Sequence, residues 1–412
     1  MLLASSGASG FYKGVPDGAV EIGNNCWYSI LSEEDKTAVF CGMDACFGPG
    51  FIEEFDIPAY VKFPDRDEKS EYTVVEIGEE AFSIHYNCIP QYYQFDYSGG
   101  YEDCMVGKVT LPETVTKIGA GAFSGAHADG FSEFRFPESV TDIGIECFYR
   151  ASGVERIYLP KGLKVIPSSF AYMCKYLKEC DIPAGVESIG ACAFYRCHAM
   201  ERVYIPASVK LIGTDAFTAL VKIDAFEVDP ANEYYSSPDG ILLDKEGKTL
   251  IAWPFARSAD VVIPEGVETM FGCPLNHAYH LFSSIDLPST MKSLPEGSFR
   301  YNTHLKKIIV RAEVPPICEG DEENPLFDDL GSYGNIKLYV PAGSVEAYRA
   351  APVWKEFRNI LAIGSDAVET VEMDSVSAEA EYFTLDGRKT ESPAEGEIVI
   401  RRQNGKSTAI IR

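Results

Sequence analysis

The fold of this chain is decided by the stretch VTLPETVTKIGAGAF, residues 109–123. Related stretches span residues 134–148, 157–170, 180–194 and 203–217. The proline that follows the first strand of each unit recurs at intervals of 25, 23, 23 and 23 residues, at Pro112, Pro137, Pro160, Pro183 and Pro206. Self-similarity at a fixed period is the signature of a solenoid, in which each unit packs mainly on its two neighbours.

Every unit follows the same local pattern. A short strand alternates inward and outward residues and ends at the proline, which cannot donate a hydrogen bond to a strand ladder. A second extended piece ends in Ile-Gly, where glycine is expected to supply unusual backbone angles, and a turn then delivers Ala-Phe to the core. Ile166-Pro167 replaces Ile-Gly in the third unit, so that corner is expected to differ. The period predicts a leucine-rich repeat solenoid, right-handed and β-rich, with short helical or irregular turns.

Stacking the units in register sorts their strand residues into columns. One outward column alternates in charge, through Lys108, Glu133, Arg156, Glu179 and Arg202. Because neighbouring strands lie about 4.8 Å apart, each charge would face an opposite one, a contribution of roughly 0.2–1 kcal/mol per pair. This charge ladder is expected to set the strand register, with ligand contact as the alternative. The two inward columns are apolar apart from one cysteine and contain Val109, Phe134, Ile157, Cys180 and Val203, and Leu111, Phe136, Leu159, Ile182 and Ile205.

The next outward column is the candidate binding face, and it contains Thr110, Arg135, Tyr158, Asp181 and Tyr204. Tyr and Arg are enriched among the residues that dominate protein interfaces, although Tyr also suits any solvated strand. A second candidate is the insertion at residues 86–101, which is rich in Tyr and Gly. It would either contact a sugar or a protein or pack on the flank of the solenoid, through Tyr92, Tyr93 and Tyr97.

The composition restricts the class of partner. The chain has 412 residues, 46% of them hydrophobic, and a formal net charge of −26. Such a charge disfavours binding to nucleic acid and to anionic membrane surfaces. No apolar run approaches the roughly 20 residues that a membrane-spanning helix needs. The first residues lack the basic segment and the length of a signal peptide, a start that is also compatible with a signal already removed.

The period also delimits the regions of the chain. Residues 1–50 are predicted to contain an N-terminal capping hairpin, with strands at 27–31 and 37–40. The repeats are expected over residues 51–311, with insertions at 83–104 and 226–258, the second containing a hairpin. A C-terminal cap is expected at 312–364 and an acidic linker at 365–378. Residues 379–412 are predicted to form a small β module of three strands, because Asp386-Gly387 and Asn404-Gly405 are strong hairpin-turn signals.

The sequence indicates no catalytic residues, metal site or cofactor. Its cysteine and histidine spacings do not fit zinc, and phosphate-binding, Gly-x-Ser-x-Gly and His-Glu-x-x-His motifs are absent. The acidic run at 319–324 lacks the EF-hand pattern and is expected to be a solvated loop. Cys41 and Cys46 are compatible with a disulfide to each other or to Cys26. Five cysteines lie at repeat positions where a thiol is expected to be buried as a small hydrophobe: Cys147, Cys174, Cys180, Cys192 and Cys197.

Residues 180–197 carry the pattern IPxxVxxIGxxAFxxC, which resembles the BspA-like leucine-rich repeat family of bacterial surface proteins. The hairpin sequence at 232–242 and the segment at 338–360 resemble further features of that family, so the resemblance extends over residues 55–364. The tail at 382–388 is similar to C-terminal modules of secreted proteins in the same bacteria, although it lacks their aromatic-rich second strand. The resemblance implies an extracellular or cell-surface protein that is not an enzyme and whose usual role is adhesion or protein binding.

These observations predict a secreted or cell-surface protein that binds a protein partner on the face of its solenoid. Carbohydrate binding through the insertion at 86–101 and a purely structural role are the alternatives.

Overall fold

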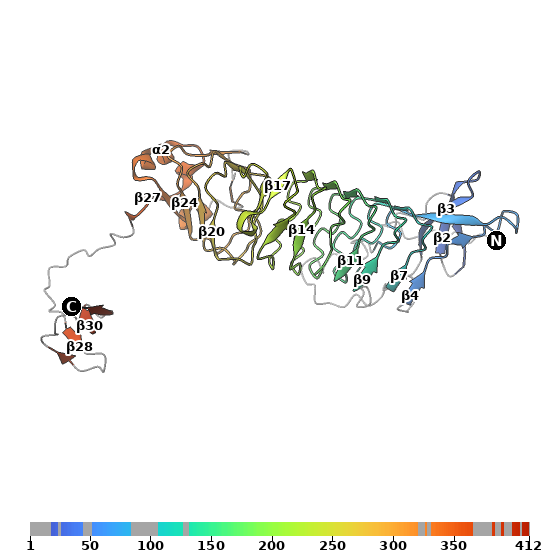
Figure 1. Cartoon of the computed structure of the whole chain (residues 1–412), viewed down its shortest axis with the longest axis horizontal. Helices are drawn as coiled ribbons and strands as arrows, with labels where there is room; N and C mark the ends of the chain where they lie inside the picture. Colours follow the sequence, from blue (N-terminus) through green and yellow to red (C-terminus); the bar gives the residue numbers. More distant parts are fainter. Residues whose placement is uncertain are drawn as a thin grey trace, which may run out of the picture. The chain divides into compact units, whose positions relative to one another are not determined.

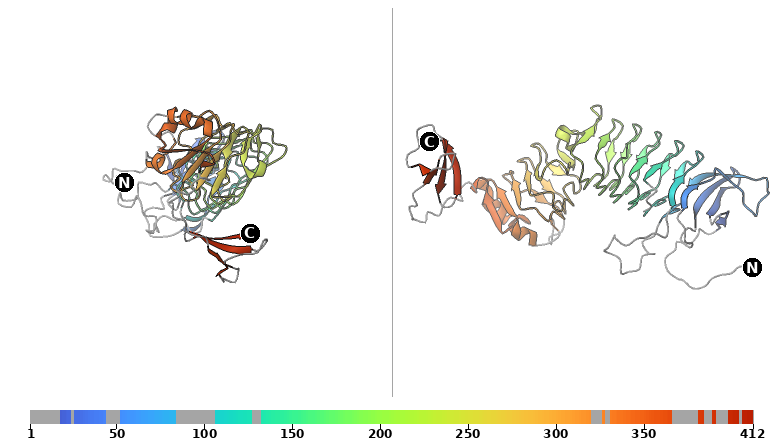
Figure 2. Two further views of the ribbon diagram at one scale, coloured as in Figure 1. Left: turned by 90° about the vertical axis from the view of Figure 1, so that its left-hand side faces the viewer. Right: turned by 90° about the horizontal axis from the view of Figure 1, so that it is seen from below.

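The computed structural model describes residues 18–23, 26–43, 52–83, 106–126, 132–319, 326–327, 331–365, 381–383, 389–390, 398–403 and 406–411. It divides into two units, Met1–Ala362 and Ile363–Arg412. In the first unit, short strands follow one another in a row of stacked turns (Figures 1 and 2). This arrangement confirms the predicted leucine-rich repeat solenoid.

The predicted N-terminal hairpin is present and covers the first turn of the row. Strands β2 (Cys26–Ser32) and β3 (Thr37–Met43) pair in antiparallel fashion, and β1 (Val20–Glu21) pairs with β2. β3 then pairs in parallel with β6 (Tyr72–Ile77), to which β5 (Tyr60–Val61) is antiparallel. The hairpin therefore continues the sheet of the repeats and buries its own apolar side chains, among them Tyr28 and Phe40.

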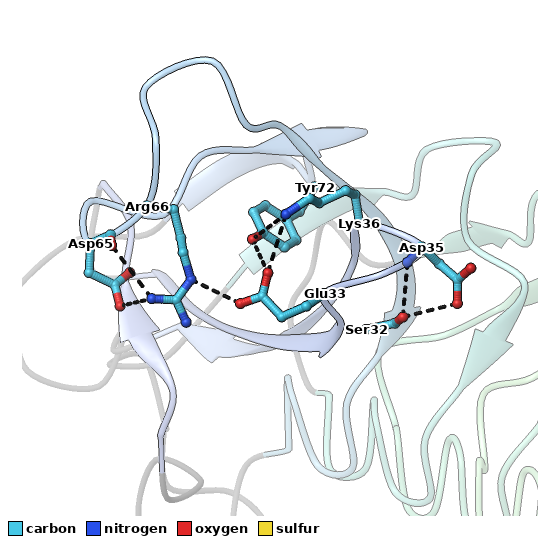
Figure 3. A network of polar contacts seen from close by, with 7 residues as sticks. All are labelled: Ser32, Glu33, Asp35, Lys36, Asp65, Arg66 and Tyr72. Carbon is cyan, nitrogen blue, oxygen red and sulfur yellow. Dashed lines mark hydrogen bonds and ion pairs between the residues drawn. The ribbon is translucent and has the colours of Figure 1, made fainter.

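A polar network joins the turn of this hairpin to the loop that precedes β6 (Figure 3). The Tyr72 hydroxyl donates to Glu33 Oε2 over 2.5 Å, and Arg66 Nε donates to Glu33 Oε1 over 2.9 Å. Lys36 Nζ lies 3.2 Å from the Tyr72 hydroxyl. The hydrogen bond from Tyr72 and those from the two cations hold the pKa of Glu33 below its ordinary value. The network anchors the N-terminal hairpin to the ring of Tyr72. This side chain is inaccessible to water.

The first ladder of the solenoid consists of parallel strands whose inward columns form the core. Leu159 is only half-buried, whereas the other nine residues of the two predicted columns are buried as expected. The pairs are β4 (Ile52–Asp56) with β7 (Val106–Thr110), β9 (Glu133–Arg135) with β11 (Arg156–Tyr158), and β14 (Val203–Ile205) with β16 (Phe226–Val228). A further parallel sheet comprises β20 (Asp260–Val262), β22 (Ser284–Leu287), β24 (Lys307–Val310), β26 (Lys337–Val340) and β27 (Asn359–Ala362).

The second ladder runs along the Ile-Gly corners and is interrupted at Pro167. β8 (Lys117–Ile118) and β10 (Asp142–Ile143) belong to one sheet, while β12 (Val165–Ile166), β13 (Ser188–Ile189) and β15 (Leu211–Ile212) form another. At a regular corner the glycine N–H donates to the preceding unit, as from Gly190 to Ile166 O over 2.8 Å. Pro167 has no N–H to donate, which explains the break and confirms that the third corner differs.

Close backbone packing, rather than an unusual backbone angle, explains the corner glycines. Gly119, Gly144, Gly190 and Gly213 are absent from the positions with positive φ, so the expectation of unusual angles is wrong there. A Cβ added to any of them would lie 2.2–2.4 Å from a backbone nitrogen of the preceding unit. The side chain is missing because the neighbouring chain segment occupies its place.

The turns that follow the corners are irregular, and each contains left-handed residues. In the fourth unit these are Cys192, with φ of 54°, and Arg196, with φ of 59°. Equivalent turns stack through backbone hydrogen bonds, for example from Arg150 N to Tyr172 O and from Met173 N to Tyr195 O, both 2.7 Å. The turns therefore keep the same register as the strands.

The predicted hairpin in the second insertion is present, with one strand more than expected. β17 (Tyr235–Ser236) precedes β18 (Leu242–Asp244) and β19 (Thr249–Ala252), all antiparallel. β19 pairs in parallel with β21 (Thr269–Met270), so the insertion rejoins the row, and β23 (Ser293–Leu294) pairs with β25 (Ile317–Cys318). The short helices are α1 (Gly331–Asn335), α2 (Val345–Ala350) and the 3₁₀ turns η4 (Pro238–Gly240), η5 (Ala342–Ser344) and η6 (Trp354–Glu356).

The end of the first unit is closed by buried aromatic residues. Trp354 packs edge-to-face on Tyr348 and stacks on Phe357, with ring centroids 5.4 and 6.0 Å apart. The second unit is a four-stranded antiparallel sheet in the order β29-β28-β30-β31. Its strands are β28 (Glu381–Phe383), β29 (Lys389–Thr390), β30 (Ile398–Gln403) and β31 (Lys406–Ile411), so the expectation of three strands missed β29.

Candidate functional site

The predicted outward column contains a stacked pair. Arg135 and Tyr158 lie directly opposite each other on β9 and β11. The Arg135 guanidinium carbon lies 3.9 Å from the centroid of the Tyr158 ring. Arg135 is exposed and Tyr158 half-buried, so that a cation held on a ring faces solvent at this point of the strand face.

Farther along the column, the side chains contact residues outside the column rather than one another. The Tyr204 hydroxyl donates to Asp229 Oδ2 over 2.7 Å, and this bond raises the pKa of Tyr204 while lowering that of Asp229. Asp181 lies 3.9 Å from Arg202 and remains almost fully exposed. Asp229 was missed in the sequence because it follows the last regular unit, where the period no longer assigns residues to columns.

The charge ladder is confirmed at its centre. Arg156 lies 3.0 Å from Glu133 and 3.1 Å from Glu179, on either side of it. Lys108 pairs with Glu54, at 3.1 Å, one strand earlier than the predicted column begins. Arg202 pairs with Asp181, which belongs to the next column, so the expected pairing with Glu179 is wrong there. These charges are largely neutralised by one another.

Several predicted positions lie outside the described residues. They are Tyr92, Tyr93 and Tyr97 of the first insertion, Cys46, and all but one residue of the acidic run at 319–324. Cys41 carries a free thiol 3.3 Å from the Ser29 hydroxyl, so the disulfide that the sequence left open for this residue is not formed.

The repeat cysteines behave mainly as buried hydrophobic residues. Cys147, Cys174, Cys180 and Cys197 are buried as predicted, and burial raises the pKa of their thiols. Cys192 is only half-buried, so the prediction of burial is wrong for this residue. It has a left-handed backbone conformation in its turn. Within the described ranges, no group of three or more His, Cys, Asp or Glu residues is arranged to hold a metal ion.

A second cluster, which the sequence did not reveal, lies on the turns. Tyr149, Tyr172 and Tyr195 stack in three successive units, with ring centroids 4.9 and 5.0 Å apart. His277 meets Tyr195 edge-to-face at 5.5 Å and stacks on Tyr301 at 4.1 Å. The 23-residue spacing of the three tyrosines could have revealed this cluster, but only strand residues were sorted into columns. We call the three tyrosines the tyrosine row.

The imidazole of His277 is expected to make the stability of the chain sensitive to acid. Burial, and then the charge of Arg196, lowers the pKa of His277 to about 4. Below the ordinary value of 6.5 the unfolded chain binds a proton that the folded chain does not, so the free energy of unfolding decreases as the pH falls from about 6.5 to about 4. His277→Gln should therefore lose less stability than the wild type between pH 7 and pH 4.5, measured as urea midpoints.

The control for this prediction is His280→Gln, which changes an exposed imidazole nearby. His280→Gln should lose as much stability between pH 7 and pH 4.5 as the wild type does. An unchanged difference in His277→Gln would contradict the assigned role of His277.

Among the helices of the described residues, none is long and apolar enough to cross a membrane. No curated protein matches the chain. Two of the solved structures that are similar to the chain cover most of its length. A leucine rich cell surface protein from Faecalibacterium prausnitzii is 21% identical, with a TM-score of 0.53, over 85% of this chain and 96% of that one. The pneumococcal vaccine antigen PcpA is 17% identical, with a TM-score of 0.54, over 84% of this chain and 98% of that one.

The family comparison agrees with the repeats that the structure shows. The model for the BspA type Leucine rich repeat region matches six copies, at residues 97–224 and 255–320. These ranges contain the stacked strands β7 to β15 and β20 to β24. The repeats at these residues are thus BspA-type leucine-rich repeats, as their resemblance implied.

Proposed function

We propose that the chain is a non-catalytic binding protein of the bacterial cell surface that holds a protein partner on its strand face. The binding residues are Arg135, Tyr158, Asp181 and Tyr204. The match of the repeats to the BspA type Leucine rich repeat region and the cell-surface description of the Faecalibacterium prausnitzii structure support the location. Like that relative, the chain would act outside the cell.

The observation that carries the proposal is the stack of Arg135 on Tyr158. Arg and Tyr are among the residues most often found at interface hot spots. A guanidinium already held on a ring loses less conformational freedom when a partner binds, which leaves more of the contact energy for affinity. The neighbouring charge ladder neutralises itself, whereas this pair keeps its positive charge directed to solvent.

Tyr204 extends the same face. It is 39% exposed, and its hydroxyl is fixed by Asp229. Because the ring is oriented by a charged hydrogen bond, it offers an apolar surface of defined direction rather than a mobile side chain. Asp181 supplies an exposed carboxylate between the two tyrosines in the order of the repeats.

Alanine at Tyr158 and Tyr204 together is expected to weaken partner binding at least tenfold. The full chain would be tested by surface plasmon resonance on immobilised fibronectin, collagen and laminin. The wild type should bind at least one of these proteins.

The matched control is Tyr176→Ala, since Tyr176 is 54% exposed, more than Tyr204, and lies on a turn outside the column. It should bind as the wild type does. Equal binding by the double variant and the wild type would show that the strand face is not the binding site, and absence of binding to all three proteins would count against this class of partner.

A further inference from the structure

The tyrosine row is a repeated feature of the turns with no role in the strand face. Tyr149, Tyr172 and Tyr195 occupy equivalent turn positions in three successive units. Their rings are nearly parallel, with interplanar angles of 6° and 13°. The backbone bonds from Arg150 N to Tyr172 O and from Met173 N to Tyr195 O hold neighbouring turns at this spacing.

Stacking determines which part of each ring is available. The faces of adjacent rings cover each other, and all three side chains are half-buried. Among the described residues no hydrogen bond is made by the hydroxyl of any of the three, and none of these oxygens is a buried atom without a partner. The three hydroxyl oxygens are therefore at least partly accessible, although burial raises the pKa of Tyr172 and Tyr195.

Basic and imidazole groups lie at one end of the row. Arg196 follows Tyr195 directly, and its guanidinium carbon lies 5.7 Å from the Tyr279 ring. In the described part of the chain no carboxylate pairs with Arg196, and its buried Nε atom has no hydrogen-bond partner. His198 Nε2 is likewise buried and unpartnered. Both nitrogen atoms are shielded from solvent, so a surface ligand would contact the other nitrogen atoms of the Arg196 guanidinium.

Asp215, an acidic residue whose charge acts on Tyr195, is engaged by other hydrogen-bond donors. Its carboxylate accepts hydrogen bonds from Cys273 N at 2.7 Å and from the Thr218 hydroxyl at 3.2 Å. Burial raises the pKa of Asp215 above its ordinary value. A guanidinium without a carboxylate partner is notable in a chain whose net charge is −26.

The spacing of the row selects among extended ligands. An extended peptide rises about 3.3 Å per residue and returns to the same face only after two residues, about 6.6 Å, which does not match ring centroids 4.9 and 5.0 Å apart. The net charge of −26 opposes the binding of any polyanion, so an acidic ligand requires a local cation such as Arg196. A polymer that carries many hydroxyl groups and an anionic group matches both the row and the guanidinium, which binds carboxylate and sulfate through two parallel hydrogen bonds.

We propose that the turn face carries a binding site for an acidic polysaccharide. The tyrosine row exchanges hydrogen bonds with sugar hydroxyl groups along the solenoid. Arg196 holds a carboxylate or sulfate of the polymer, and His198 and His277 border that position. The site is separate from the strand face and does not depend on the proposed protein binding.

Affinity electrophoresis of the full chain tests this site with polygalacturonate, which carries carboxylates, and dextran sulfate, which carries sulfates. Uncharged dextran and polyphosphate serve as comparison polymers. At least one acidic polysaccharide should retard the chain more strongly than dextran and polyphosphate do, and the stronger of the two identifies the acidic group. Arg196→Gln should weaken this binding at least tenfold, whereas Arg202→Gln, on the exposed strand face, should change it less than twofold.

A second variant removes hydroxyl groups without disturbing the stack. Replacing Tyr149, Tyr172 and Tyr195 together by Phe keeps the rings and should weaken binding at least tenfold, with an unchanged circular dichroism spectrum. The proposal is overturned if neither acidic polysaccharide binds better than dextran, if polyphosphate binds equally well, or if Arg202→Gln weakens binding as much as Arg196→Gln.

Discussion

Gly190→Ala is expected to lower the free energy of unfolding by about 3 kcal/mol or more, as overpacking of a core does in its severe cases. The added Cβ would lie 2.2 Å from Ser168 N and 2.6 Å from Pro167 C. Both are backbone atoms, so no flexible side chain can move aside. Relief requires the fourth unit to separate from the third, which breaks the hydrogen bond from Gly190 N to Ile166 O. Urea denaturation followed by circular dichroism measures the loss.

The matched control is Gly162→Ala. A Cβ added at Gly162 would have no atom within 4 Å, and the φ of this residue is not positive. Alanine there should leave stability unchanged or raise it by about 0.4–1 kcal/mol through the entropy of the unfolded chain. Similar midpoints for the two variants would contradict the explanation of the corner glycines by close backbone packing.

Asn232→Ala is expected to cost about 3 kcal/mol, because it leaves several buried backbone groups without partners. The Asn232 side chain donates to Pro206 O at 2.8 Å and to Val209 O at 3.0 Å. Its Oδ1 accepts from the backbone N–H groups of Tyr234 and Tyr235, both at 2.8 Å. The side chain is only 1% exposed, so water cannot replace these four bonds without opening the structure. Thermal and urea denaturation measure the loss.

Asn359→Ala is the control for this change. Asn359 is an exposed residue of β27, and its side chain makes a single 3.3 Å bond to Gly334 O. Its substitution should change stability by less than about 0.5 kcal/mol, as is usual at the surface. A comparable loss in both variants would mean that the four bonds of Asn232 have no special role.

The position of Asn232 explains the size of this effect. It lies where the regular period ends, and it ties the start of the second insertion to the last regular unit. The two apolar clusters of the first unit meet in this region, the first ending with Leu242 and Ala252 and the second beginning with Ala219 and Ile241. Loss of these bonds should therefore loosen the joint between the two halves of the core.

Much of the fold could be predicted because two simple periods act together. Alternation along a strand assigns each residue to the inside or the outside, and the 23-residue repeat brings equivalent residues side by side. Phe134 and Ile157 were placed in the core on this basis, and Arg156 between two glutamates. The hairpins at the N-terminus and in the second insertion were recognisable because polar turns separate their apolar runs.

The candidate site was predicted less completely. Arg135 and Tyr158 fell in one column, but their stacking depends on side-chain rotamers that the repeat does not specify. Tyr204 was placed correctly on the outside, while its partner Asp229 lies beyond the regular units. The tyrosine row was missed because the turns contain left-handed residues, so no simple alternation tells which side chains point outward.

The sequence by itself determined the repeat, the inward columns and the alternation of charge, because each follows from the periodic spacing of residue types. The tertiary structure decided why Gly190 is glycine, which carboxylate holds Tyr204, and that three tyrosines stack on the turns. These features depend on how closely neighbouring units approach. That distance is set by the packing of one turn on the next and is not a property of any single turn.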